Sequence, residues 1–332
     1  MSDTPDMPID LGYPSHDYLH DRPGYRGTSL QEFFALFPDN QSCLRHIFHR
    51  RFGVKPYCRK CDGEFADWRL LPNRKVFQHR CAFNLSPLGN TALSHTRVDL
   101  VLWFYAFLHI ANSPESVSIK SLARHLGLEE RVAFRMLHRM RLHIAALDSE
   151  RVIGQPGEPL LIRLRKIKSV RTGKGMRNRV RYLVIGDRDQ VTTFVVGQPN
   201  VARVRSFITR CRAPGSILLT DCPETFHLLS DRGYGRPLAQ LEASAWKNNF
   251  DGQDTLQSFE SYFHRPMKNQ HNRVDMHKLW LYLKEYEFRY NRRYNSKSIF
   301  PDLVSDFPIV TGQRLEDLWA QNSAIRSLGL MQ

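Results

Sequence analysis

The spacing of apolar runs after Pro159 constrains the fold of this 332-residue chain more than any other feature of its sequence. Four short runs have strand character: Leu160–Leu164, Tyr182–Ile185, Val191–Val196 and Ser216–Thr220. The second and third flank a polar segment at residues 186–190, which predicts a β-hairpin. Helical patterns follow at Val201–Arg212 and His277–Arg293. A hairpin followed by strands that alternate with helices is typical of a mixed-sheet α/β domain.

A turn-rich segment separates this region from the helices that precede it. Gly154–Gly157 combines two glycines with a proline, and we place the main domain boundary there. Helical periodicity covers Ser29–Phe37, Asn40–Arg51 and most of Arg97–Leu147. We therefore expect a multidomain chain of mixed α+β and α/β class. Its parts are a tail (1–27), a helical lead-in with a cysteine module (28–96), a helical middle (97–150), the mixed-sheet domain (155–300) and a C-terminal extension (301–332).

Three cysteines and a histidine form a specific motif in the N-terminal part. Cys58 and Cys61 make a C-x-x-C knuckle, and His79 and Cys81 follow at a separation typical of zinc ribbons. The place of a fourth cysteine is taken by Asn84, a poor zinc ligand, and His79 offers a nitrogen instead. The sequence predicts a zinc-ribbon-like module, either with structural zinc or held by packing alone. A redox pair is the least favoured interpretation, because no thioredoxin-like βαβ pattern surrounds it.

The helical middle contains a segment of helix-turn-helix form. Ser118 is a suitable N-cap for a first helix, and Gly127 fits the tight turn before a second. Val132, Met136 and Met140 recur on one side of the second helix, so its arginines are expected to face DNA. The candidate DNA contacts are Arg131, Arg135 and Arg139. A helical bundle with a solvated basic face is the alternative.

A run of nine basic residues without an acidic one lies between positions 163 and 181. They are Arg163, Arg165, Lys166, Lys168, Arg171, Lys174, Arg177, Arg179 and Arg181. Such a run repels itself unless it is solvated or neutralised, so a phosphate backbone is its natural partner. The whole chain has 48 Lys and Arg against 33 Asp and Glu, a formal charge of +15, which also favours a polyanion. The sequence therefore predicts DNA as a partner, with a purely solvated loop as the alternative.

No segment of the sequence is suited to a membrane. The longest apolar stretch, Val98–Ala111, is shorter than the roughly 20 residues that span a bilayer. The N-terminal stretch Met1–Asp21 is polar and acidic, unlike a signal peptide. We therefore expect no membrane partner, a cytoplasmic location and reduced cysteines.

Several phrases of the sequence together resemble the ISXO2-like transposase domain of the IS1595 group. The closing phrase Tyr282–Arg293 is the strongest, and Cys58–Cys61, Arg80–Thr91 and Pro214–Asp221 support it. The resemblance extends over most of the chain, from about Phe37 to Arg293. It implies a zinc ribbon, a helical linker and a ribonuclease-H-like domain. In such a domain, acidic side chains bind Mg²⁺ for DNA strand cleavage and transfer.

The set of acids that the resemblance implies is incomplete in this chain. Asp221 matches the second metal-binding acid, and Glu260 and Lys268 match residues of the last helix of the catalytic site. The first acid belongs on the first strand, where this chain has Ile162 or Arg163. Because a two-metal site needs its shared carboxylate, the resemblance implies an impaired catalytic centre.

Three functions are compatible with these observations. The favoured one is a transposase-related, DNA-binding protein in which catalysis is impaired. An active transposase that uses Mg²⁺ with Asp221 and Glu260 is the first alternative. A non-catalytic partner or regulator of an active transposase is the second. The protein partners implied are a second copy of the chain or an active transposase. Zinc is the structural metal expected, and Mg²⁺ is expected only if catalysis survives.

Overall fold

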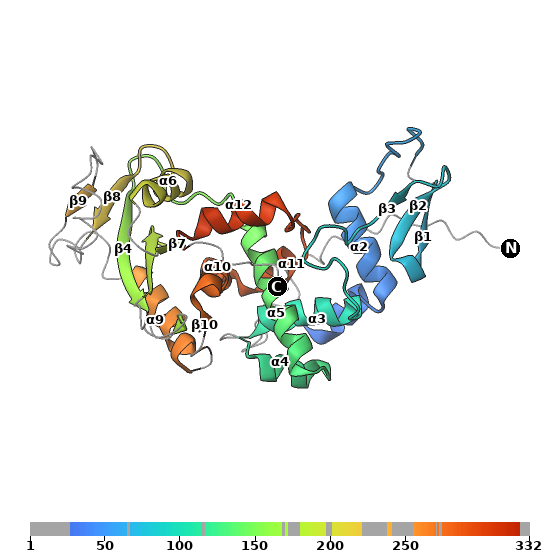
Figure 1. The fold of residues 1–332 in the computed structure, drawn as a ribbon, viewed down its shortest axis with the longest axis horizontal. Helices are drawn as coiled ribbons and strands as arrows, with labels where there is room; N and C mark the ends of the chain where they lie inside the picture. Colours follow the sequence, from blue (N-terminus) through green and yellow to red (C-terminus); the bar gives the residue numbers. More distant parts are fainter. Residues whose placement is uncertain are drawn as a thin grey trace.

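The computed structural model describes residues 27–64, 67–113, 117–167, 170–171, 180–196, 201–220, 238–240, 255–269, 271 and 274–325. A small sheet with helix α2 lies at one end of the molecule, and a larger sheet lies at the other (Figure 1). Helices from both the N-terminal and the C-terminal parts of the chain fill the middle. In the described residues, no helix is long and apolar enough to cross a membrane.

Two short capped helices open the described chain. Helix α1 (Leu30–Leu36) starts after Ser29, whose hydroxyl accepts a hydrogen bond from the Glu32 amide while the Glu32 carboxylate accepts one from the Ser29 amide. Helix α2 (Asn40–Phe52) starts after Asp39 with the same reciprocal pairing to Ser42. These capping boxes satisfy amides that have no partner inside the helix. Both helices predicted from periodicity are therefore confirmed, with ends within one residue.

The cysteine module (residues 54–95) is built on a small antiparallel sheet. Its strands are β1 (Trp68–Leu71), β2 (Val76–His79) and β3 (Asn84–Leu85), in the order β1-β2-β3. The 3-10 turn η3 (Pro72–Arg74) joins the first two strands. The ring of Phe77 in β2 stacks on Phe48 of α2 with centroids 3.9 Å apart. This contact attaches the module to the helices.

The helical middle consists of α3 (Leu100–Asn112), α4 (Ile119–Leu126) and α5 (Glu130–Leu147). Its apolar side chains share one core with α1, α2 and α11 (Ile299–Leu303), which comes from the far end of the chain. Two buried histidines hold this C-terminal segment against the N-terminal helices. His46 Nε2 lies 2.7 Å from the Val304 carbonyl oxygen, and His143 Nε2 lies 2.8 Å from that of Leu303. Residues from the start of the predicted C-terminal extension are thus part of the N-terminal core.

A mixed five-stranded sheet forms the core of the second half, as the sequence predicts. Its order is β7-β6-β4-β8-β9, with antiparallel pairing among β4, β6 and β7 and parallel pairing among β4, β8 and β9. The strands are β4 (Pro159–Ile167), β6 (Val180–Gly186), β7 (Val191–Val196), β8 (Ile217–Thr220) and β9 (Leu238–Gln240). The predicted hairpin is confirmed, since β6 and β7 pair through Gly186 and Val191.

Helices cover both faces of this sheet. Successive side chains along a strand point to opposite faces, and β4 carries apolar side chains on both of them. Leu160, Ile162 and Leu164 of β4 pack with α6 (Val201–Cys211). Leu161 and Ile167, which point the other way, pack with the opposite layer. That layer holds α9 (Thr255–Asn269), α10 (Leu279–Tyr290) and α12 (Gln313–Asn322). The smaller elements β5 (Val170–Arg171), β10 (Val274–Asp275), η4 (Met276–Lys278) and η5 (Arg293–Ser298) complete the described chain.

Helix α10 is buried along its length and carries charged residues at its centre. Glu285 Oε2 lies 2.6 Å from Arg141 Nε of α5, and Glu285 Oε1 lies 3.8 Å from Arg289 Nη1. Burial alone raises the pKa of Glu285, but Arg141 and Arg289 outweigh burial and hold its pKa below the usual value. Glu287 accepts hydrogen bonds from the amide and hydroxyl of Thr193 in β7, each at 2.8 Å. This helix therefore joins α5 to the sheet.

One side of α10 carries apolar and aromatic side chains that belong to the core. Leu279, Leu283, Tyr286 and Tyr290 are all buried. They belong to the same core as the sheet face and helix α9.

Replacing Arg141 with Met tests the buried ion pair between Arg141 of α5 and Glu285 of α10. The change leaves the Glu285 carboxylate buried without its closest cation, so we expect the free energy of unfolding to fall by about 3–5 kcal/mol. Urea unfolding followed by circular dichroism measures this loss. Arg135→Met is the matched control on the same helix, because Arg135 is exposed and its loss is expected to stay within about 0.5 kcal/mol. Equal losses in the two variants would contradict the structural role of the pair.

The two buried histidines predict a loss of stability in acid. Burial lowers the pKa of His46 and of His143 to about 4, below the ordinary value of 6.5. The unfolded chain therefore takes up these protons first, so the free energy of unfolding falls as the pH drops from about 6.5 to about 4. Each histidine contributes at most roughly 3 kcal/mol. His143→Gln keeps a donor for Leu303 without a titrating group, and its unfolding should depend less on pH across this window.

Candidate functional site

Four side chains of the cysteine module converge on one point. The ligand atoms of Cys58, Cys61, His79 and Cys81 all lie within 4.8 Å of one another. Cys58 Sγ and Cys81 Sγ are 3.6 Å apart, and His79 Nδ1 lies 3.4 Å from Cys61 Sγ and 3.2 Å from Cys81 Sγ. Ligands around a tetrahedral zinc ion stand roughly 3.3–3.8 Å from one another. The group can therefore bind a metal such as zinc.

Two tight turns bring these ligands together. In the first, Asp62 takes a left-handed conformation (φ 50°) and its amide donates to the Cys58 carbonyl at 2.7 Å. In the second, Ala82 is left-handed (φ 64°) and its amide donates to the His79 carbonyl at 2.9 Å. Asn84 lies in β3, is exposed and is not part of the group. His79 at the end of β2 thus takes the fourth place, as the sequence suggested.

The surroundings of His79 hold its ring in place. Asp67 Oδ2 lies 3.4 Å from His79 Nε2, on the side of the ring that faces away from the cysteines. A carboxylate at that nitrogen fixes the orientation of a metal-binding histidine. Gly63 lies against the same ring, and a Cβ there would come within 2.6 Å of His79 Cε1. The hydrogen bond with His79 is the main reason that the pKa of the Cys81 thiol falls to about 6, which favours the metal-binding thiolate.

The face of the large sheet beneath α9 carries arginines where the resemblance implies an acid. Ile162 packs toward α6, so Arg163 is the residue of this pair that points to the α9 side, where it is 5% exposed. Two residues further along the same face, Arg165 Nε lies 2.6 Å from Glu260 Oε1 of α9. The Glu260 side chain is only 14% exposed. The acid of the last helix is therefore bound to a guanidinium group from the first strand.

A neutral pair lies close to these charges. The Tyr182 hydroxyl of β6 is 3.0 Å from His264 Nε2 of α9. Burial first, and then the nearby Arg165, lowers the pKa of His264. Burial and the charge of Glu260 raise the pKa of Tyr182. Both groups are therefore neutral near pH 7 and do not offset the charge of the arginines.

The described residues do not assemble a carboxylate site for Mg²⁺. Asp221 lies outside them, and β8 ends just before it, at Thr220. Lys268 is exposed near the end of α9. Among the described residues, the cysteine-module cluster is the one group of three or more His, Cys, Asp or Glu side chains that can hold a metal ion. The described residues alone therefore do not bring two carboxylates together around Glu260.

The predicted DNA contacts of the basic run are described in part. Lys166 is exposed, and Arg181 is half-buried. Lys168, Lys174, Arg177 and Arg179 lie outside the described residues, as does the side chain of Arg171.

The two helices and the turn predicted in the helical middle are present. The Ser118 hydroxyl accepts the Ser121 amide at 3.1 Å to cap α4, and Gly127 adopts the left-handed conformation (φ 63°) before α5. Of the three candidate arginines on α5, Arg131 and Arg135 are exposed. Arg139 turns back toward the protein.

Arg139 is engaged inside the molecule. Its guanidinium group donates to the Ser94 carbonyl and lies 5.7 Å from the centre of the Trp103 ring. Helical spacing placed Arg139 in line with Arg131 and Arg135, but the second half of α5 enters the core. Arg139 therefore helps to attach α5 to the protein, and its predicted contact with DNA stays a prediction.

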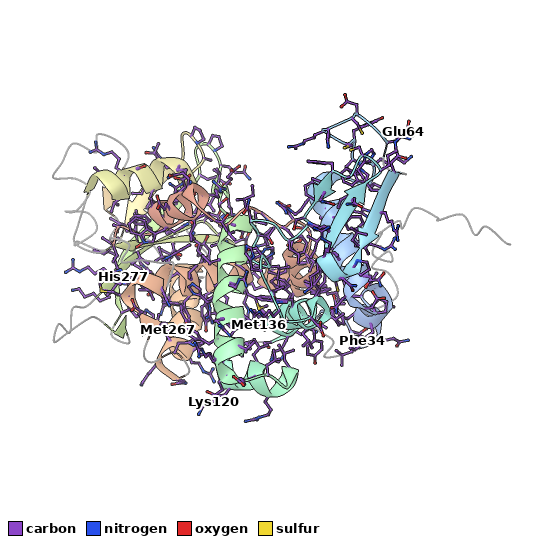
Figure 2. All side chains as sticks on the ribbon, turned by 45° about the vertical axis from the view of Figure 1, so that its right-hand side comes forward. Phe34, Glu64, Lys120, Met136, Met267 and His277 are labelled. Carbon is purple, nitrogen blue, oxygen red and sulfur yellow. The ribbon has the colours of Figure 1, made fainter. Side chains whose placement is uncertain are left out.

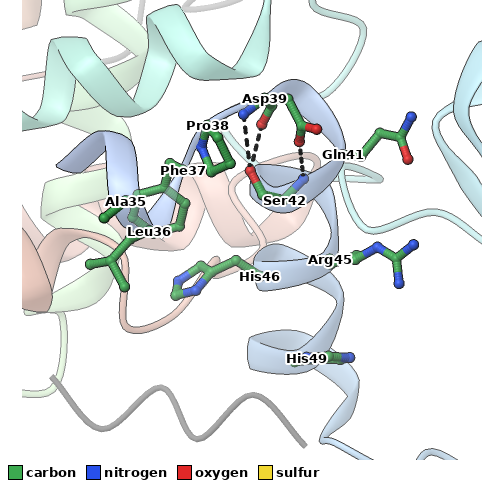
Figure 3. Close-up of a pocket in the computed structure, with 10 residues that line it drawn as sticks. All are labelled: Ala35, Leu36, Phe37, Pro38, Asp39, Gln41, Ser42, Arg45, His46 and His49. Atoms are coloured by element: carbon green, nitrogen blue, oxygen red, sulfur yellow. Dashed lines mark hydrogen bonds between the residues drawn. The ribbon is translucent and has the colours of Figure 1, made fainter. Parts of the chain in front are cut away.

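A surface pocket lies at the elbow between α1 and α2 (Figure 3). It is lined by Ala35, Leu36, Phe37, Pro38, Asp39, Gln41, Ser42, Arg45, His46 and His49. Asp39 and Ser42 are already engaged in capping α2, as the dashed lines show. The pocket contains none of the site residues predicted from the sequence.

The cluster of cysteines and histidine predicts one bound metal ion per chain. Purified protein is expected to contain about one zinc by elemental analysis, and Co²⁺ exchange should give the absorption bands of a tetrahedral thiolate site. Cys58→Ala should abolish both signals. The matched control is Cys43→Ala, because Cys43 is a buried cysteine of α2 outside the cluster. Full zinc content in the Cys58 variant would contradict the assignment.

Comparison with known proteins identifies the second half of the chain. Residues 154–291 match the model of the ISXO2-like transposase domain. The matched segment starts at the predicted boundary and ends just after α10, so it contains the whole mixed sheet with α6 and α9. A search of curated proteins gives no match. Residues 154–291 are therefore similar to an ISXO2-like transposase domain, which supports a relation of this part of the chain to the IS1595 group of transposases.

Proposed function

We propose that this protein binds DNA as a transposase-related protein whose metal-dependent chemistry is impaired. The observation that carries the proposal is the 2.6 Å ion pair between Arg165 and Glu260, beside the buried Arg163. A metal ion at this place would have to displace a guanidinium group from the carboxylate it needs, and two like charges would repel it further. The active transposase that uses Asp221 and Glu260 is the alternative.

The topology supports a ribonuclease-H-like assignment for residues 155–300. Three antiparallel strands are followed by two strands that lie on the other side of β4 and run parallel to it. The first strand of this sheet, β4, is its central strand. The parallel strand β8 pairs directly with it. We propose that the helical lead-in with its zinc-ribbon-like module (28–96) and the helix-turn-helix-like middle (97–150) are separate DNA-binding parts.

The distribution of exposed charge supports a nucleic-acid partner. On α4 and α5, exposed cations are Lys120, Arg124, Arg131 and Arg135. The cysteine module exposes a further set: Lys55, Arg59, Lys60, Arg69, Arg74 and Arg80. With a formal charge of +15 on the whole chain, these groups can neutralise phosphates and release counterions. A protein that binds DNA without cutting it can act as a regulator of an active transposase, and this role follows from the same proposal.

Binding and cleavage are tested together on the full-length chain. A mixed-sequence duplex of about three helical turns serves as probe, and fluorescence anisotropy measures its binding. We expect affinity to fall by about 10³-fold or more between 50 and 200 mM salt if six or more phosphates are contacted. We expect no nicking of plasmid DNA in Mg²⁺ or Mn²⁺. Control reactions leave out Mg²⁺ and Mn²⁺ and contain no chelator, so that any metal bound by the cysteine module stays in place.

Glu260→Gln separates the two candidate functions. In an impaired protein it leaves DNA binding unchanged or slightly stronger, because it removes a negative charge next to Arg165. In an active transposase it abolishes nicking. Nicking by the unaltered chain that this variant loses would overturn the claim of impaired chemistry, and binding indifferent to salt would overturn the DNA-binding claim.

A further inference from the structure

We propose that the N-terminal half of α5 reads DNA sequence in the major groove, with Phe134 in contact with a thymine methyl group. This inference rests on the proposed DNA-binding function and specifies which surface supplies sequence preference. Arg131 and Arg135 flank Phe134 on the helix and contact the neighbouring base pairs.

Because of the way α5 packs, the side chains of Arg131, Phe134 and Arg135 point away from the core. Ala133, Met136, Leu137 and Met140 are buried in the helical core that α5 shares with α4. The helix positions between them therefore point away from the core. Arg131 and Arg135 are exposed, and Phe134 is 42% exposed. Lys120 lies at the outer end of the same helix pair (Figure 2).

Phe134 is a large, partly exposed apolar side chain that lies between the exposed cations Arg131 and Arg135 along α5. The ammonium group of Lys278 lies 5.5 Å from its ring centre, and the exposed cations Lys120 and Arg124 come from the adjoining α4. A surface that approaches phosphates would ordinarily be polar throughout. The major groove offers one apolar group, the C5 methyl of thymine, and phenylalanine is among the side chains that contact it.

The acids at the start of α5 also fit base recognition better than general phosphate binding. Glu129 and Glu130 are exposed directly before Arg131. Carboxylates weaken attraction to the backbone wherever the helix lies, but they can accept a hydrogen bond from the cytosine amino group in the groove. This end of α5 therefore carries an acceptor, donors and an apolar contact within two turns.

The second half of α5 holds the first half in a fixed direction. Arg141 is paired with Glu285 at 2.6 Å, and Arg139 is bound to Ser94. Gly127 allows the sharp turn that sets α4 across α5. Recognition side chains on an anchored helix lose little freedom on binding, which favours discrimination between bases.

Thymine-to-deoxyuridine substitution tests this contact directly, because the two bases differ by the C5 methyl group alone. Preferred sites are first selected from a randomised duplex library with the full-length protein. Each thymine is then replaced singly by deoxyuridine. We expect one replacement to weaken binding about fourfold, the effect of one buried methyl group. Phe134→Ala should bind the thymine and deoxyuridine duplexes equally.

Phe34→Ala is the matched control. Phe34 is also an exposed phenylalanine (51%, against 42% for Phe134) but lies on α1, so its variant should keep the fourfold difference. Arg131→Gln and Arg135→Gln should relax the preference at base pairs next to the thymine by about tenfold. Circular dichroism and thermal unfolding check that each variant is folded.

The outcomes separate this inference from the proposal on which it rests. Salt-dependent binding without sequence preference, or a thymine effect that Phe134→Ala retains, overturns recognition by α5 and leaves DNA binding in place. Absence of any DNA binding overturns both. If Phe134→Ala changes the oligomeric state and not the thymine effect, Phe134 is a protein contact and the inference is wrong.

Discussion

The buried charges of α10 determine how the parts of this molecule are joined. Burying a carboxylate is costly unless close cations and hydrogen bonds compensate it. Glu285 finds Arg141 on α5, and Glu287 finds Lys284 on its own helix and Thr193 on β7. One helix therefore ties the helical middle to the mixed sheet, so the direction of α5 depends on pairs inside the matched transposase segment.

The same chemistry has a different consequence on the face of the sheet. There too a guanidinium group and a carboxylate meet at 2.6 Å, through Arg165 and Glu260. At α10 such a pair is structural, but beneath α9 it engages Glu260, the carboxylate that a catalytic metal would use if the implied role of this residue holds. The fold tolerates this change because β4 packs toward α6 through Leu160, Ile162 and Leu164, which do not depend on what the opposite face carries.

Local signals in the sequence predicted most elements, whereas contacts between distant residues were beyond it. Capping residues, Gly127 and the apolar runs act within a few positions, so α1, α2, the α4–α5 turn and the β6–β7 hairpin could be predicted. The engagement of Arg139 and Arg141 could not, because it depends on whether α5 meets partners such as Glu285, 144 residues away from Arg141. Periodicity shows which side of a helix is apolar, but not where along its length the polar side becomes buried.

The two candidate metal sites also differ in what they contribute to folding. The cysteine module has strands of only two to four residues and little core of its own, so a metal held by Cys58, Cys61, His79 and Cys81 would supply much of its stability. A catalytic site collects acids from distant elements and places like charges together, which costs stability until metal binds. Arg165 beside Glu260 removes that repulsion. On the proposal above, folding therefore favours keeping the first site and permits loss of the second, and the exposed N-terminal half of α5 belongs to neither.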